Sequence, residues 1–137
     1  MVADSDSYLK WAVARALDLQ DEWEVELVVV RNAVTPSATQ TSAAVDGRLS
    51  PPASLSFEVL VSRLRDDPPD LLLLACRGPL IELLLLGELK GQRAARVVAT
   101  GIPGIWFPPT DLGLRLRAAC DLVIVHSVRE REEVESR

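Results

Sequence analysis

Short apolar runs alternate with segments of helical periodicity along most of this chain. The runs "DLLLLAC", "RVVATG" and "DLVIVHS" are almost wholly apolar, and "WEVELVVV" becomes apolar at its end. Strands of this kind are buried on both faces, which is typical of a parallel sheet covered by helices. Because parallel crossovers are right-handed, the pattern predicts an α/β fold: a Rossmann-like, doubly wound parallel sheet of about five strands with helices on both faces.

The expected elements can be placed along the chain by their patterns. The expected strands are 1–3, 23–30, 70–76, 96–101 and 121–127. The expected helices are 7–19, a short one near 37–45, then 54–67, 79–89, 111–119 and 128–137. The first strand has at most three residues, which is short for the start of such a sheet.

Length and composition exclude several classes of protein. The chain has 137 residues and is expected to form one domain, 1–137. Its net charge of −5 argues against binding of nucleic acid, since proteins that bind phosphate backbones carry clustered Lys and Arg. No 18-residue apolar stretch and no secretory signal is visible, so we expect a cytoplasmic protein without a transmembrane segment.

The cysteines and the histidine give no metal-binding pattern. Cys76 and Cys120 lie in apolar segments far apart, and the sequence has no CxxC and no Cys/His cluster. We therefore expect free thiols and no metal ion. The motifs GxGxxG and GxxxxGK[ST] are also missing, which disfavours a dinucleotide or P-loop site.

The polar, Gly-rich and Pro-rich turns follow the expected strands. They are "DSDS", "RNAVTPS", "CRGP", "TGIPG" and "HSVRE". Ligands of doubly wound sheets bind outside the carboxyl ends of the strands, and the carboxyl ends of parallel strands share one edge. The five turns are therefore expected to form one candidate site.

The N-terminal turn has a structural and a functional interpretation. Asp6 or Ser5 is well placed to cap the helix that follows, and acids there favour the positive end of the helix dipole. Alternatively, one carboxylate faces a ligand as a base or hydroxyl acceptor. Lys10 either pairs with Asp6 or points at the same cleft.

The other strand ends supply further candidates, each with a structural alternative. Arg77 and Gly78 precede a helix start and suit an anion, although a surface Arg before a structural turn fits equally well. His126 ends a strand at the same edge and is a candidate base, although a lone His is more often structural. The candidate catalytic residues are Asp6 and His126, and the candidate ligand-binding residues are Asp4, Ser5, Ser7, Lys10, Arg77, Gly78, Thr100, Gly101, Gly104 and Ser127. The terminal "REREEVES" is interpreted as a solvated helix face.

The order of these motifs resembles a family of uncharacterised actinobacterial glycosyltransferases. The resemblance lies in "ADSDSYLKW", "WEVELVVVR" followed by "TPS", then "RGP", "TGIPGI" and "HSVRE", and it spans nearly the whole chain. It implies a nucleotide-sugar-dependent transferase with two Rossmann-like domains, of which this chain is similar to the N-terminal, acceptor-side one. On this basis a nucleotide-sugar is the co-substrate, and no other cofactor is expected.

Two other functions fit the sequence as well. The first is a catalytically inert Rossmann-like binding or oligomerisation module, with a homodimer or a further C-terminal domain as partner. The second is a nucleotide-binding regulator of flavodoxin-like shape, for which Asp4 and Asp6 would form an acidic pocket. That class also needs an acid after a later strand, which "CRGP" does not provide. The leading hypothesis is transfer of a sugar to a glycan or small-molecule acceptor.

Overall fold

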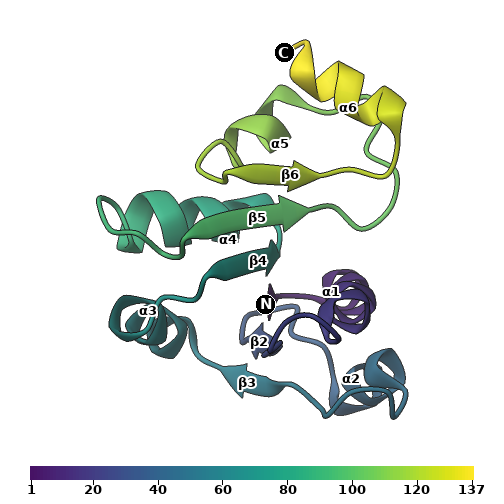
Figure 1. Cartoon of the computed structure of the whole chain (residues 1–137), viewed down its shortest axis with the longest axis vertical. Coiled ribbons are helices and arrows are strands. Elements are labelled where there is room, and N and C mark those ends of the chain that lie inside the picture. Colours follow the sequence, from purple (N-terminus) through teal and green to yellow (C-terminus); the bar gives the residue numbers. More distant parts are fainter.

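The computed structural model describes all 137 residues and contains one parallel sheet of six strands (Figure 1). The strand order is β3-β2-β1-β4-β5-β6. The strands are β1 (Val2–Ala3), β2 (Val28–Val30), β3 (Ala53–Leu55), β4 (Leu71–Ala75), β5 (Val97–Gly101) and β6 (Leu122–Ile124). The helices are α1 (Asp6–Leu19), α2 (Ala38–Val45), α3 (Phe57–Asp66), α4 (Gly78–Glu82) with its π-helical continuation η1 (Leu83–Glu88), α5 (Asp111–Arg115) and α6 (Val128–Glu135). The predicted α/β, Rossmann-like parallel sheet is confirmed, with six strands where about five were expected.

The strand that the sequence did not reveal is β3. It is an edge strand that pairs only with β2, and Ala53 and Ser54 are exposed. A strand of three residues with so little burial carries no apolar run, and the helix expected over 54–67 included Ser54 and Leu55. That helix begins at Phe57, where the Ser56 hydroxyl accepts a hydrogen bond from the Val59 N–H and caps it.

The sheet is strongly twisted. In Figure 1 the arrows of β3 and β6 point to opposite sides, although all neighbouring strands are parallel. Each strand is rotated by about 20–25° against its neighbour, and the rotation accumulates across the sheet. The carboxyl ends of the central strands β1 and β4 therefore lie side by side, whereas the outer strands are rotated away from them.

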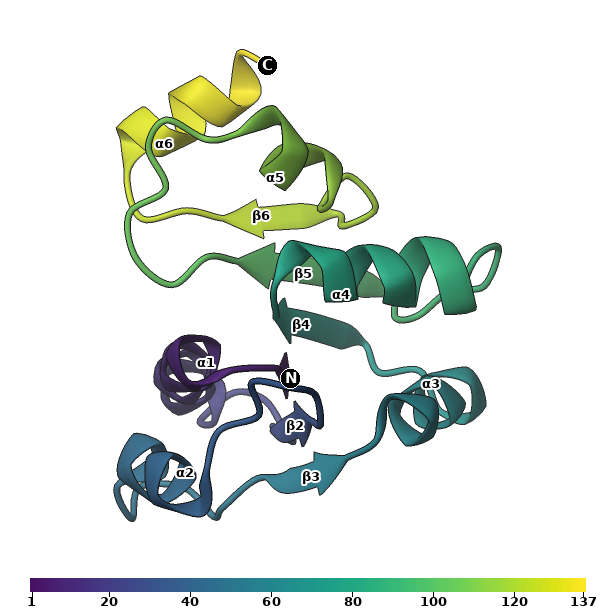
Figure 2. The same ribbon diagram turned by 180° about the vertical axis from the view of Figure 1, so that it is seen from behind.

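Helices cover both faces of the sheet, as predicted. On one face, α1 and α2 pack on Ala3, Val29 and Ala75. On the other, α3, α4 and η1 pack on Val2, Val28, Val30, Leu72 and Leu74. Figure 2 shows α4 in front of the strands, whereas in Figure 1 it lies behind them. The alternation of Val2 and Ala3 between the two faces explains why both are buried and apolar.

Asp6 or Ser5 was expected to cap the first helix, and the start of α1 confirms this only in part. Ser5 occupies the N-cap position, but its side chain makes no capping hydrogen bond. Asp6 is the first helical residue, one position later than a cap. The short helix α2 was predicted correctly, and Ser37 and Gln40 form a reciprocal capping box at its start.

The strand order fixes where a ligand site is expected. From β1 the chain moves to β2 and β3 on one side, and from β4 to β5 and β6 on the other. The order reverses between β1 and β4, and ligands of such sheets bind at this switch point, outside the carboxyl ends. Asp4 directly follows β1, and Cys76 and Arg77 directly follow β4.

Candidate functional site at the carboxyl edge

Asp4 is a fully buried carboxylate at the switch point. Its Oδ2 accepts hydrogen bonds from the backbone N–H of Arg77 at 3.1 Å and from Arg77 Nε at 2.9 Å. Its Oδ1 is also buried and has no hydrogen-bond partner. A buried charge needs an opposite charge beside it, and the Arg77 guanidinium provides it. Asp4 therefore holds Arg77 at the point where the β1 and β4 ends meet.

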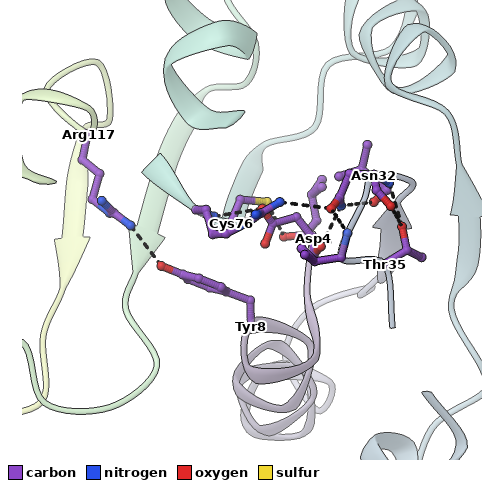
Figure 3. A network of polar contacts seen from close by, with 10 residues as sticks. Asp4, Tyr8, Asn32, Thr35, Cys76 and Arg117 are labelled. Atoms are coloured by element: carbon purple, nitrogen blue, oxygen red, sulfur yellow. Dashed lines mark hydrogen bonds and ion pairs between the residues drawn. The ribbon is translucent and has the colours of Figure 1, made fainter. Parts of the chain in front are cut away.

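Asn32 fixes Arg77 from the other side. Arg77 Nη2 donates to Asn32 Oδ1 at 3.0 Å, while Asn32 Nδ2 donates to the backbone carbonyls of Asp4 at 2.7 Å and Val30 at 2.9 Å. Asn32 itself is held in a turn by Thr35, whose hydroxyl accepts from the Asn32 N–H (Figure 3). The ends of β1, β2 and β4 are thus joined by one polar network.

Arg77 is the accessible member of this network. Its side chain is 46% exposed, whereas that of Asp4 is 0% exposed. Nε and one Nη2 hydrogen are used by Asp4 and Asn32, so Nη1 and the second Nη2 hydrogen have no protein partner. A guanidinium held in this way is arranged in advance for an anionic acceptor such as a carboxylate or a phosphate.

Tyr8 and Arg117 form a second polar pair beside Asp4 (Figure 3). Arg117 is 6% exposed; its Nη2 donates to the Tyr8 hydroxyl at 3.0 Å and its Nη1 to the Gly113 carbonyl at 3.1 Å. Its guanidinium lies 5.6 Å from the centroid of the Trp106 ring. Burial raises the pKa of Tyr8, so the phenol stays protonated at neutral pH.

The Cys76 thiol lies in the same region but is structural. It is fully buried and its Sγ donates to the Val2 carbonyl at 3.3 Å. Burial raises the pKa of this thiol well above its usual range, so it is no nucleophile at neutral pH. Cys76 and Cys120 are both free, in agreement with the prediction.

His126 follows the end of β6 and contacts the residue that follows β5. Its Nε2 lies 2.6 Å from the Ile102 carbonyl oxygen, which can only accept, so Nε2 carries the proton. In the neutral ring this leaves Nδ1 as a proton acceptor, and the residue is exposed. Because β6 lies two strands from β4, the ends that carry His126 and Arg77 are about 10 Å apart.

Glu130 organises this part of the edge and was missed by the sequence analysis. Its carboxylate is 1% exposed and accepts hydrogen bonds from the backbone N–H of Trp106 at 2.5 Å and of His126 at 2.8 Å. The hydrogen bond from Trp106 is the main cause that lowers the pKa of Glu130. The signal was present as Ser127-Val128-Arg129-Glu130, the spacing of a capping box, and Ser127 Oγ does accept from the Glu130 N–H.

Three of the four predicted glycine and threonine positions are tightly packed. A Cβ on Gly101 would lie 2.4 Å from Cζ2 of Trp11, and one on Gly78 would lie 2.8 Å from Cδ1 of Leu116. The Thr100 hydroxyl is buried and donates to the Leu74 carbonyl at 2.8 Å. Gly104, with φ of +91°, lies in the open loop after β5. Of these positions, Gly104 is the one with free space around it.

The remaining predicted residues lie on the first turn of α1. Asp6 Oδ2 accepts from Lys10 Nζ at 2.7 Å, so these two residues pair with each other. Ser5 is half-buried and Ser7 is exposed. Ser127 caps α6 through Glu130. The structure thus joins Asp4 and Arg77 directly, and it places Asp6 with Lys10 and His126 with Ser127 in separate groups.

No group of three or more His, Cys, Asp or Glu side chains is arranged to hold a metal ion. No helix is long and apolar enough to cross a membrane.

The fold and the site together define a class: a Rossmann-like α/β protein whose polar network lies at the switch point of a parallel sheet. The comparison with protein families gives a match over the whole chain. The model of the family described as "Putative glycosyltransferase (DUF6716)" matches residues 1–137, and the chain belongs to this family. Comparisons with curated proteins and with solved structures gave no significant match.

Proposed function

We propose that this chain is the acceptor-side Rossmann-like domain of a nucleotide-sugar-dependent glycosyltransferase, and that the acceptor binds at the carboxyl edge between β1 and β6. The observation that carries the proposal is the Arg77 guanidinium, held by Asp4 and Asn32 at the switch point with its Nη1 group unpartnered. Membership of the glycosyltransferase family supports the reaction class.

In this proposal the residues have distinct roles. Arg77 binds a carboxylate or phosphate of the acceptor, and Asp4 is a positioning residue, since its carboxylate is buried. His126 takes the proton from the acceptor hydroxyl through Nδ1, and the Ile102 carbonyl orients the ring. Asp6 is the weaker candidate for the base because Lys10 already occupies one of its oxygens.

Ligand titration followed by backbone NMR shifts tests this proposal. We expect uronic acids and sugar phosphates to shift signals of Arg77 and His126 more strongly than neutral sugars of the same size. Arg77→Gln should remove the difference. Arg31→Gln is the matched control, because Arg31 is exposed after the neighbouring strand β2 and its side chain has no hydrogen-bond partner.

Two outcomes would contradict the proposal. Tight binding of nucleotide-sugars to this chain alone would assign it to the donor side instead. Equal loss of binding in both Arg variants would show that net charge, and not the held guanidinium, attracts the ligand.

A second candidate function is self-association without catalysis. It is favoured by exposed apolar side chains around α5 and α6, namely Ile105, Leu112 and Val128, and by Leu122 on the edge strand β6. Multi-angle light scattering after size exclusion should then give a dimer mass that Ile105→Asp converts to the monomer mass. A monomer at all concentrations removes this candidate.

A further inference from the structure

Residues 102–119, which we call the strap, join β5 to β6 and carry α5. Figure 2 shows the strap running from the end of β5 past α6 to the start of β6. Within it only Pro109 and Arg117 are buried, and none of its residues belongs to either apolar core. Because apolar burial is the main source of stability in a fold, polar contacts have a large share in holding the strap in place.

Most of these polar contacts join the strap to α6 and to the turn before it. The Trp106 N–H, for example, donates to the Glu130 carboxylate. Among side-chain hydrogen bonds, only one links the strap to residues 1–101: Arg117 Nη2 donates to the Tyr8 hydroxyl at 3.0 Å (Figure 3). The Tyr8–Arg117 bond therefore holds the strap against the first turn of α1.

Arg117 is a buried cation without a counter-charge. It is 6% exposed and forms no ion pair with a carboxylate. Its contacts with the Tyr8 hydroxyl, the Gly113 carbonyl and the Trp106 ring are all with neutral groups. Two of its five N–H donors are used, so three have no protein partner, and the Nε group among them is fully buried. An unbalanced buried charge is costly, and an oxyanion would supply both the missing charge and the missing acceptors.

The guanidinium of Arg117 lies beside the turn that follows β4. A Cβ on Gly78, the residue after Arg77, would lie 3.1 Å from Arg117 Nη1. This turn belongs to the carboxyl edge of the sheet, where ligands of doubly wound sheets bind. The Asp4 carboxylate at the same edge is already paired with Arg77, so it does not balance the charge of Arg117.

We propose that the strap is a lid over a second anion subsite, in which Arg117 binds an oxyanion such as a phosphate or carboxylate group. The strap opens with loss of the Tyr8–Arg117 hydrogen bond, and it closes again over the bound anion with the charge of Arg117 balanced. This inference goes beyond the proposed transferase function and does not depend on it, because the subsite uses Arg117 and not Arg77.

Amide hydrogen exchange of the full chain, measured by mass spectrometry, tests the lid. The readout is the exchange of residues 114–118, whose amides are hydrogen-bonded within the strap. After correction for intrinsic rates, we expect these amides to exchange at least about 100-fold faster than those of β4. Low concentrations of urea should accelerate exchange in β4 but not in the strap, because the strap opens without global unfolding.

Tyr8→Phe tests the bond that holds the strap. It removes the hydroxyl that Arg117 binds, so exchange of residues 114–118 should become about tenfold faster. Ser7→Ala is the control, because it removes an exposed hydroxyl from the same helical turn and should change nothing. Strap exchange that depends on urea as β4 does, or that Tyr8→Phe leaves unchanged, would overturn the lid.

Inorganic phosphate, compared with sodium chloride at the same ionic strength, tests the subsite. We expect phosphate to slow exchange of residues 114–118 at least about threefold, because a ligand that binds the closed strap stabilises it. The effect should persist in Arg77→Gln and in Arg115→Gln, which changes an exposed position of the strap, and Arg117→Gln should abolish it. If Arg117→Gln does not fold, Arg117→Lys, which keeps the charge but loses the forked donors, should weaken it.

The outcomes separate this inference from the proposed function. No effect of phosphate on the strap, or the same effect in Arg117→Gln, would overturn the subsite. An effect that is lost in Arg77→Gln but kept in Arg117→Gln would also overturn it and would assign the phosphate to the Arg77 site. Where the subsite is present, glucose 1-phosphate and uridine diphosphate distinguish a sugar phosphate from a nucleotide as the source of the anion, by which of them slows strap exchange at the lower concentration.

Discussion

Asp4 and Asp6 are two acids of the same turn, and the structure predicts very different effects for the same substitution at each. Asp4 is fully buried and accepts two hydrogen bonds from Arg77, whereas Asp6 pairs with Lys10 at the surface. Asp4→Ala removes both bonds and leaves the Arg77 backbone N–H without its partner. Asp6→Ala removes one exposed i,i+4 ion pair.

The magnitudes follow from these contacts. A hydrogen bond to a charged group contributes about 1.5–3 kcal/mol when buried, and Arg77 is half exposed, so we take the lower value for each and expect Asp4→Ala to cost about 3 kcal/mol. An exposed helical ion pair contributes about 0.3–0.5 kcal/mol, and an acid in the first helical turn adds a similar amount, so Asp6→Ala should cost less than about 1 kcal/mol.

Urea unfolding followed by circular dichroism measures both values. With a slope of about 1.5 kcal/mol per M, the midpoint should fall by about 2 M for Asp4→Ala and by less than about 0.7 M for Asp6→Ala. Equal shifts would refute the reasoning. A cost below about 1 kcal/mol for Asp4→Ala would mean that the Asp4–Arg77 pair is not persistently formed, and the candidate anion site would lose its support.

Three further outcomes can be checked. Gly101→Ala should lower the urea midpoint, because the added Cβ would lie 2.4 Å from the Trp11 ring. Trp11→Leu should then lower the free energy of unfolding less in the Gly101→Ala protein than in the unchanged one, and additive effects would contradict the contact. The pKa of Glu130 is lowered, so its carboxylate stabilises the fold above its ordinary pKa of 4.5, and this stabilisation is lost as the pH falls through the lower folded value. Glu130→Gln should therefore lower the urea midpoint at pH 7 and weaken the decline of that midpoint in acid. Glu132→Gln, at an exposed position of the same helix, should do neither. Burial raises the pKa of Cys120 to about 11, so its reaction with a disulfide reagent at pH 8 should be slow and should speed up with each pH unit; fast reaction in the folded protein would show that the thiol is not buried.

The fold was predictable from the sequence because burial on both faces leaves a clear pattern. Four of the six strands coincide with apolar runs, and β1 was recognised as a short strand. β3 was missed because an edge strand with exposed Ala53 and Ser54 carries no such pattern. The extent of β2 was overestimated, since "WEVEL" alternates like a strand but the strand spans only Val28–Val30, of which Val28 and Val29 pair with β1 and all three pair with β3.

The sequence indicated which strand ends carry polar residues, but not which of their side chains contact one another. The sequence placed Arg77 just after the carboxyl end of a strand, and Arg77 does follow β4. Its partner Asn32, 45 residues away in sequence, could not be identified, because a strand end with several polar residues does not reveal which side chain turns inward. Glu130 could not be identified either, because in the sequence of a charged helix a buried glutamate cannot be distinguished from its exposed neighbours.

The amino-acid sequence by itself determined the sheet, its parallel strands and the edge on which the polar turns gather, because apolar periodicity and turn chemistry are local properties. Tertiary structure decided which of the two acids in "DSDS" matters to that edge. Asp4 directly follows the central strand β1 and is buried against Arg77 of the neighbouring β4, whereas Asp6, two residues later, is carried by α1 to the surface beside Lys10. The difference arises from strand order, which brings residues 73 positions apart into contact and which no local pattern encodes.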